Sequence, residues 1–272
     1  MNYLRLKKIA RPLSFLTASL LLFISCVSIE ANAQNNSSLT PTQTVREFYR
    51  LMRERHFREA FALSIYKSAI DGLSAGEFEE LRPDFEKMAA AIPEKIDVNG
   101  EQVSGEIATV FVKIADADKA AAEAEPVTLI RDGGTWIVGD SENQQIVKKA
   151  GKRFFFEARI ETHHSEVQAM LQRISLAELA YATQHSNTFA DLPTLIKAGL
   201  VPKDIETPET TGYRFHLVLT KDAKHWAAEA VPVEYGRTGR LSFILDQEGI
   251  RSGDKGGKPL VPEEELIEVT PK

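Results

Sequence analysis

Residues 158–184 read ARIETHHSEVQAMLQRISLAELAYATQ, and this stretch decides the fold of the C-terminal half of the chain. Apolar residues recur at alternating spacings of three and four, which predicts one long helix over residues 153–184 with a single apolar stripe. The stripe consists of Ile160, Val167, Met170, Ile174, Ala177 and Tyr181. Because the second half adds Leu171, Leu176 and Leu179, we expect that half to be the more buried.

The residues after this helix predict short antiparallel strands. A short helix is expected over 192–198, ending at Gly199. Apolar and polar residues alternate from Tyr213 to Leu219, and strands are also expected over 226–231 and 241–245. Gly236 and Gly239 mark the hairpin between the last two strands. The segment 153–262 therefore reads as a long helix packed on a small antiparallel sheet.

This half resembles the soluble domain of type IV pilins and type II secretion pseudopilins. The resemblance is carried by Ala177-Glu178 and Tyr181, Phe189-Ala190-Asp191-Leu192, Gly199-Leu200-Val201, Gly212-Tyr213-Arg214-Phe215, Ala230-Val231-Pro232, Gly239-Arg240-Leu241-Ser242-Phe243, and Asp246 with Gly249. It covers about 95 residues and implies an assembly or interaction module. The segment 12–28 lacks the processing site of that family and its glutamate, so we expect the chain not to polymerise as a pilus subunit.

Residues 40–140 predict helices followed by a meander of strands. Thr40-Pro41-Thr42-Gln43 forms a capping box that starts a helix, and further helices are expected from Phe57 and from Ser74, the latter interrupted by Pro83. Strands are expected at 96–98, 107–114, 127–130 and 135–138. A turn is expected at Asn99-Gly100. A second turn is expected at Asp132-Gly133-Gly134, and this sequence between two strands is a strong hairpin signal.

This half resembles the small NTF2-like domains of exported bacterial proteins. The motifs are TPTQTVREFY at 40–49, FREAF at 57–61 and DGGTWIV at 132–138. The resemblance implies a cone made of helices and a curved antiparallel sheet. Some members of that family are isomerases or dehydratases with an acid or base inside the cone. Here His56 is the only histidine of this half and no paired proton carrier is visible, so we assign no catalytic residues and no cofactor.

The predicted fold class is therefore α+β with two domains. We divide the chain into a signal peptide (1–33), a tether (34–39), an NTF2-like domain (40–140), a linker (141–152), a pilin-like domain (153–262) and an acidic tail (263–272).

The first 33 residues predict export. Four basic residues precede an apolar run, and Ala31-Asn32-Ala33 matches a cleavage site, so the mature chain is expected to start at Gln34 without a membrane span. The protein is then periplasmic or extracellular. Cys26, the only cysteine, lies in a sequence similar to a lipobox, and its acylation would instead make a lipoprotein. We favour cleavage at Ala33, because Phe23 departs from the lipobox pattern.

The charge balance argues against a nucleic-acid partner. The chain has 33 basic and 39 acidic side chains, and the leader holds four of the basic ones and one of the acidic ones. The mature chain is therefore expected to have 33−4=29 basic and 39−1=38 acidic side chains, a net charge of −9. Binding to phosphates requires a basic face.

Three groups of residues are weighed as sites. Phe154, Phe155 and Phe156 follow a basic run and predict either a partner or membrane-surface contact or, as we favour, packing between domains. Glu161 and His164 have the Glu-x-x-His spacing of dimetal sites, but no second copy exists, so His163 and His164 are expected on a solvated face. Asp246, Glu248 and Asp254 are weak calcium candidates in a C-terminal loop; a solvated turn is the alternative we favour, and we assign no metal.

Together these features indicate a non-enzymatic exported protein of two modules that binds an envelope protein and serves secretion or assembly. Two alternatives stay open, namely a carrier of a small apolar ligand inside the NTF2-like cone and an NTF2-like enzyme. Partner, ligand and oligomeric state do not follow from the sequence.

Overall fold

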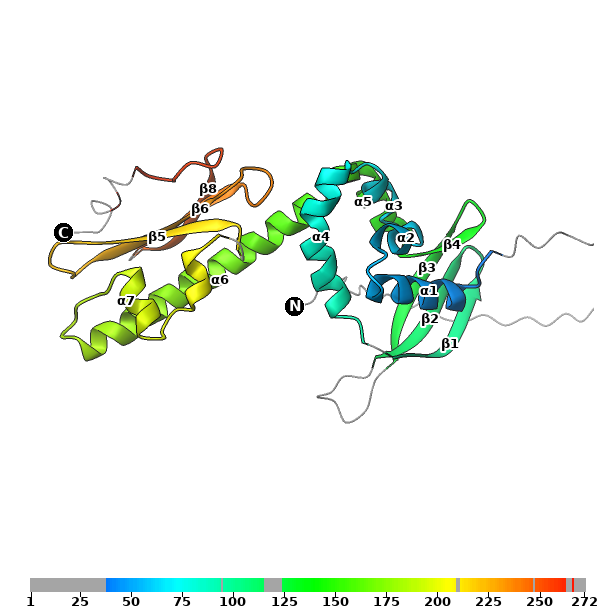
Figure 1. Ribbon diagram of the computed structural model, residues 1–272, viewed down its shortest axis with the longest axis horizontal. Helices are drawn as coiled ribbons and strands as arrows, with labels where there is room; N and C mark the ends of the chain where they lie inside the picture. Colours follow the sequence, from blue (N-terminus) through cyan, green and yellow to red (C-terminus); the bar gives the residue numbers. More distant parts are fainter. Residues whose placement is uncertain are drawn as a thin grey trace, which may run out of the picture. The chain divides into compact units, whose positions relative to one another are not determined.

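The computed structural model describes residues 38–93, 95–114, 124–208, 211–246, 248–262 and 266. These residues form an α+β protein with two four-stranded antiparallel sheets (Figure 1). The leader with Cys26, Ala31 and Ala33 lies outside the described residues, as do most of the tether and of the acidic tail.

The chain divides into two compact units. The first comprises the described residues up to Ile65 together with Phe85–Ser141, and the second comprises Tyr66–Asp84 and the chain from Glu142 onward. One boundary falls at Ser141, and Tyr66–Asp84 groups with the second unit rather than with its sequence neighbours. The expected linker is largely a helix, α5 (Ser141–Ala150).

The first unit packs a helix against a meander of strands. Its helices are α1 (Pro41–Arg53) and α2 (Phe57–Ala62), and its strands are β1 (Ile96–Ser104), β2 (Ile107–Ile114), β3 (Ala124–Asp132) and β4 (Thr135–Val138), in that spatial order. Figure 1 shows α1 lying across this sheet. Val45 and Tyr49 of α1 pack with Val110, Leu129 and Trp136 in one buried cluster.

Local signals of the first unit behave largely as predicted. The Thr40 hydroxyl accepts the N–H of Gln43, whose side chain accepts the N–H of Thr40, so the capping box is confirmed. Gly133 and Gly134 have φ angles of 58° and 84°, which the two-residue β3–β4 hairpin requires. The turn expected at Asn99-Gly100 is wrong: β1 continues through it, and the register shift between Val98 and Gly100 makes Asn99 a bulge.

The helical part of the second unit comprises α3 (Lys67–Asp71), η1 (Gly151–Arg153), α5 and the first part of α4 (Ala75–Ala90). The expectation that Pro83 interrupts a helix is wrong, because α4 runs through it. Its Phe85, in the first unit, contacts the rings of Phe57 and Phe61 at 5.7 and 5.0 Å.

The rest of the second unit is built on α6 (Phe154–Gln184), which matches the predicted long helix. After α7 (Leu192–Lys197) and η2 (Lys203–Glu206) come β5 (Tyr213–Leu219), β6 (Trp226–Pro232), β7 (Leu241–Asp246) and β8 (Gly249–Asp254), again in spatial order. Strand β8 was not expected. The core between α6 and the sheet includes Val167, Leu171 and Ile174, and Leu260, Val261 and Leu266 pack against Ala227 and Ile244 of β6 and β7.

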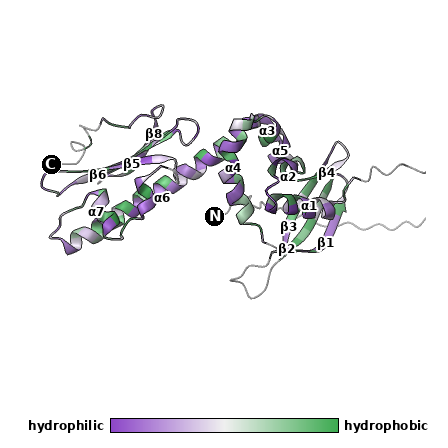
Figure 2. Cartoon of the chain, viewed as in Figure 1, coloured by the Kyte–Doolittle hydropathy of each residue, from purple (hydrophilic) through white to green (hydrophobic). Residues whose placement is uncertain are grey.

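The expectation that the second half of α6 is more buried throughout is wrong for two residues. Leu171 is fully buried, whereas Leu176 and Leu179 are 68% and 61% exposed. Apolar and polar bands alternate along the whole helix (Figure 2). Because Leu176 and Leu179 are exposed, α6 carries more apolar residues than its contact with the sheet buries.

Candidate functional site

The polar side chains of the second unit gather where the loop between β6 and β7, residues 233–240, meets α6. This loop folds back on itself: the N–H of Gly236 donates to the carbonyl of Gly239 at 2.8 Å, and the N–H of Glu234 donates to the hydroxyl of Thr238 at 3.1 Å. It thereby presents Arg237, Thr238 and Arg240 to its surroundings.

Two adjacent histidines of α6 hold this loop. Nδ1 of His163 lies 2.7 Å from the carbonyl oxygen of Thr238. Nε2 of His164 accepts the backbone N–H groups of Arg240 and Leu241 at 3.2 and 3.3 Å. Since the histidines are only 9% and 8% exposed, the expectation that they lie on a solvated face is wrong. Burial lowers the pKa of both imidazoles, so the neutral form is favoured.

Glycines allow the close approach of the loop. A Cβ atom on Gly239 would lie 2.0 Å from the hydroxyl oxygen of Tyr213, which itself donates to the carbonyl of Leu241 at 2.8 Å. A Cβ on Gly212, whose φ is 69°, would lie 2.7 Å from Cβ of Thr238 and 2.8 Å from Nδ1 of His163. The backbone of the loop is therefore pressed onto its neighbours.

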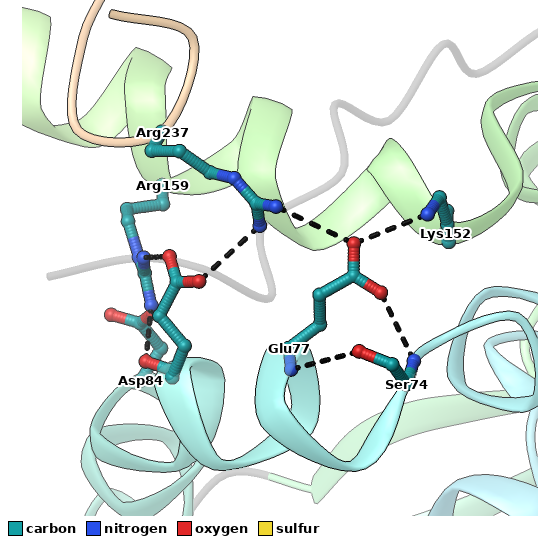
Figure 3. Close-up of polar contacts among 7 residues, drawn as sticks. Ser74, Glu77, Asp84, Lys152, Arg159 and Arg237 are labelled. Atoms are coloured by element: carbon teal, nitrogen blue, oxygen red, sulfur yellow. Dashed lines mark hydrogen bonds and ion pairs between the residues drawn. The ribbon is translucent and has the colours of Figure 1, made fainter. Parts of the chain in front are cut away.

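An acidic face of α4 lies beside this loop within the second unit (Figure 3). Glu77, Glu80 and Asp84 follow a spacing of i, i+3 and i+7, which puts them on one face of the helix. Glu77 also caps α4. Its Oε2 accepts the backbone N–H of Ser74 at 3.0 Å, and Oγ of Ser74 accepts the backbone N–H of Glu77. The cluster was not predicted, although this spacing is visible in the sequence and could have identified it.

Basic side chains from α6 and from the loop satisfy these acids. Arg159, with only 9% of its side chain exposed, contacts Asp84 at 2.7 Å and Glu80 at 3.0 Å. Arg237 reaches from the loop to Glu80 at 3.3 Å and to Glu77 at 3.5 Å. The acid cluster is thus paired with cations from two other segments, which joins α4, α6 and the loop.

The electrostatics of the cluster favour charged carboxylates. The backbone N–H of Ser74, followed by the ammonium of Lys152 at 3.2 Å, lowers the pKa of Glu77 to about 2. Burial raises the pKa of Glu157, but hydrogen bonds from Arg153 and Arg240 outweigh this effect, and the pKa is lowered. Acids held in the charged form by bound cations are suited to fixing a fold, whereas general acid–base chemistry at neutral pH needs a pKa near 7.

The three phenylalanines at the start of α6 lie within the same unit. Phe155 and Phe156 are 7% and 3% exposed, and the ring of Tyr66 lies 5.4 Å from Phe154 and 5.6 Å from Phe155. The guanidinium of Arg237 lies 4.2 Å above the ring of Phe156. Phe155 and Phe156 therefore offer no surface to a membrane or a partner.

The three calcium candidates do not meet. Asp246 pairs with Gly249, and Asp254 pairs with Leu241 at the far end of the β7–β8 hairpin, roughly 16 Å away at about 3.3 Å per residue. Asp246 accepts the N–H of Glu248 at 2.8 Å and forms an ion pair with Arg251. Asp254 accepts from Tyr235 and Gly256, each at 3.0 Å. Within the described parts of the chain, no three acids, histidines or cysteines gather in a way that could hold a metal ion.

Glu178 of α6, a residue of the pilin-like motif, is fully buried. Its Oε2 accepts the N–H of Ala190 at 3.0 Å, while Oε1 has no hydrogen-bond partner among the described residues. Burial raises its pKa to about 7, and the nearby Asp191 adds to this effect. An acid between Ala177 and Leu179 gives no sequence signal for such burial.

The outer face of α6 carries a stripe of uncharged residues. Its members are Ser165, Ala169, Gln172, Leu176, Leu179 and Thr183, all exposed. Along Val167–Gln184, all of which the structure describes, Arg173 is the only exposed charged residue. Leu176 and Leu179 are the large apolar side chains of this outer stripe, and they are 68% and 61% exposed.

None of the helices in the described residues is both long and apolar enough to cross a membrane. The NTF2-like and pilin-like identities have no support beyond the sequence motifs, because comparisons with known protein families, curated proteins and solved structures find no match for this chain.

Proposed function

We propose that this chain is a non-catalytic exported protein of two modules, and that it binds a protein partner of the cell envelope through the outer stripe of α6. The observation that carries the proposal is the exposure of Leu176 and Leu179, one helical turn apart, on a helix whose opposite face is fully buried. Apolar side chains grouped on an exposed helix face are typical of interaction sites.

The contacts that join the acidic face of α4 to α6, η1 and the β6–β7 loop, called here the polar junction, support the same interpretation. Each carboxylate of the α4 face already has a cation from α6, η1 or the loop as its partner. A substrate would have to displace these contacts before it could use the acids. The junction therefore serves to hold the loop and α6 in place, which leaves the outer stripe of α6 facing away from these contacts.

The size of the stripe indicates a transient partner rather than a stable dimer. From Ser165 to Thr183 it is roughly 27 Å long at about 1.5 Å per residue, and a helix is about 10 Å wide. The contact would bury about 300 Å² on this chain, against about 800 Å² per partner in a standard stable interface. A second copy using the same stripe would bury too little to form a stable dimer.

The two alternatives have weaker support. A carrier or an enzyme would need open space beside the inner face of the first sheet, where Val45, Tyr49 and Trp136 pack with 0%, 8% and 7% exposure. No observation on that face favours a particular ligand or reaction over packing.

Site-specific photo-cross-linking in the native cell envelope tests the proposal. A cross-linking residue at position 172 should yield an adduct with another protein, and Leu176→Glu with Leu179→Glu should remove it because charges oppose burial of the stripe. The matched control places the same residue at Ile146 of α5, which is 53% exposed. Equal adducts at both positions, or adducts only with a second copy of this chain, would contradict the proposal.

A further inference from the structure

The two histidines that hold the β6–β7 loop do so with opposite hydrogen-bonding roles. A carbonyl oxygen only accepts, so Nδ1 of His163 must carry a proton to bond Thr238. Backbone N–H groups only donate, so Nε2 of His164 must be unprotonated to bond Arg240 and Leu241. The bond of His163 therefore survives protonation of its imidazole, whereas both bonds of His164 require the neutral ring.

We propose that His164 is an acid-sensitive latch, which holds the β6–β7 loop on α6 when its imidazole is neutral and releases the loop when the imidazole is protonated. Protonation places a hydrogen on Nε2, directly facing two backbone donors. Neither donor can then be satisfied by His164, and the positive ring faces the positive ends of both N–H groups. The loop must move or lose both bonds.

The surroundings of His164 leave little room for adjustment. The rings of Tyr213 on β5 and Phe243 on β7 lie 6.4 and 5.8 Å from the imidazole. Gly239 is already pressed against Tyr213, so the loop cannot slide toward that ring. A proton on Nε2 is therefore not absorbed by a small shift of the loop.

The charged groups that face His164 do not compensate for this. Glu161 of α6 lies 3.9 Å from Nδ1, on the opposite side of the ring from the two donors. His163 of α6 and Arg240 of the loop both disfavour a second positive charge. Glu157 is engaged by Arg240 and Arg153. A protonated ring would gain from Glu161 alone, whose carboxylate is 79% exposed and so weakly effective.

The sign of the pH dependence follows from these contacts. Burial lowers the pKa of His164 in the latched state below its ordinary value of 6.5. The latch is therefore fully closed at pH above 6.5, begins to weaken below that value and opens as the pH falls through the lowered pKa. Opening would also free Arg237 and Arg240 from the acids of α4 and α6, because both arginines belong to the loop.

Hydrogen exchange of the full chain at pH 7.5 and pH 5, corrected for the intrinsic rates, tests the latch. We expect exchange of residues 233–242 to rise by about tenfold or more at pH 5, because two backbone hydrogen bonds are lost. His164→Gln supplies an acceptor that does not titrate and should abolish the acid response. His163→Asn keeps a donor and removes the other imidazole, so the acid response should persist.

The result is decisive in either direction. A wild-type loop whose corrected exchange is the same at both pH values would overturn the latch, as would an acid response abolished by His163→Asn and kept by His164→Gln. If either variant fails to fold, nitrogen NMR of wild-type His164 decides the matter. A proton on Nδ1 at pH 7.5, with a titration that coincides with shifts of the Gly239 amide, supports the latch, and a proton on Nε2 refutes it.

Discussion

Replacing Glu178 with glutamine should make the stability of the second unit less dependent on pH. The carboxyl group is fully buried on α6, and among the described residues only one of its oxygens has a hydrogen-bond donor, the N–H of Ala190. Burial raises its pKa from an ordinary value of 4.5 to about 7. The folded state thus holds a proton on Glu178 over a pH range in which the unfolded chain has released it.

The magnitude follows from this difference in pKa. A tenfold change in an equilibrium constant corresponds to about 1.4 kcal/mol, so a rise from 4.5 to about 7 corresponds to about 3 kcal/mol. The raised pKa fixes the sign: the contribution of Glu178 is fully present below pH 4.5 and is lost as the pH rises through 7. In Glu178→Gln this loss disappears, because the amide does not titrate.

Urea unfolding at pH 5 and pH 8 measures the effect. The fluorescence of Trp226, in the core of the second unit, reports that unit when Trp136 is replaced by phenylalanine. We expect the free energy of unfolding of Glu178→Gln, relative to the parent, to increase by about 3 kcal/mol from pH 5 to pH 8. The control Glu142→Gln changes an exposed acid of α5 and should show no such increase. A difference between Glu178→Gln and the parent that stays constant with pH would refute the reasoning.

Three further substitutions test the packing that positions the loop and the helices. Gly239→Ala places a methyl group 2.0 Å from the Tyr213 hydroxyl oxygen and should lower the free energy of unfolding by about 1–3 kcal/mol. The control Gly76→Ala has open space around it and should not lower the free energy of unfolding, and thermal melting compares the two variants. Arg159→Met strips two carboxylates of α4 of their nearly buried partner and should cost about 2 kcal/mol in urea unfolding, and a gain in stability would contradict the pairing. Thr40→Ala removes the capping box of α1 and should cost about 1 kcal/mol, read from Trp136 in the first unit; no change would show that the cap is unimportant.

The elements that the sequence predicted well depend on local signals. The start of α1 follows from Thr40 and Gln43, which bond each other across one turn, and the β3–β4 hairpin follows from two glycines that accept positive φ angles. The long helix follows from a repeat sustained over many turns. Each of these signals lies within one continuous segment of the chain, so tertiary packing had little to override.

The elements that the sequence missed depend on pairing with distant residues. Asn99-Gly100 is a good local turn, but the strand β2 offers a partner beyond it, and a bulge at Asn99 keeps Val98 and later residues in the ladder. Strand β8 is polar and rich in glycine, and only its pairing with β7 makes it a strand. Local preference is weaker than a continuous ladder of backbone hydrogen bonds.

The candidate site was missed for a related reason. The contacts of His163 with Thr238 and of Arg159 with Asp84 each join residues 75 positions apart. Such pairs leave no periodic trace, and the adjacent histidines therefore read as a solvated face. What the sequence does contain is the spacing of Glu77, Glu80 and Asp84 on one face of α4, and the structure pairs these acids with cations from other segments.

The leucines of α6 show where periodicity alone would have been enough. At about 100° per residue, Leu176 lies about 200° around the helix from Ile174, and Leu179 lies about 140° from it. Ile174 is buried against the sheet, so neither leucine could share that contact. Their apolar side chains cannot be explained by the core of the second unit, and helix formation alone would be served equally well by lysine or glutamate. The pair of leucines on this outer face, where Arg173 is the only exposed charged residue along the described stretch Val167–Gln184, is therefore the feature on which the proposed protein contact rests.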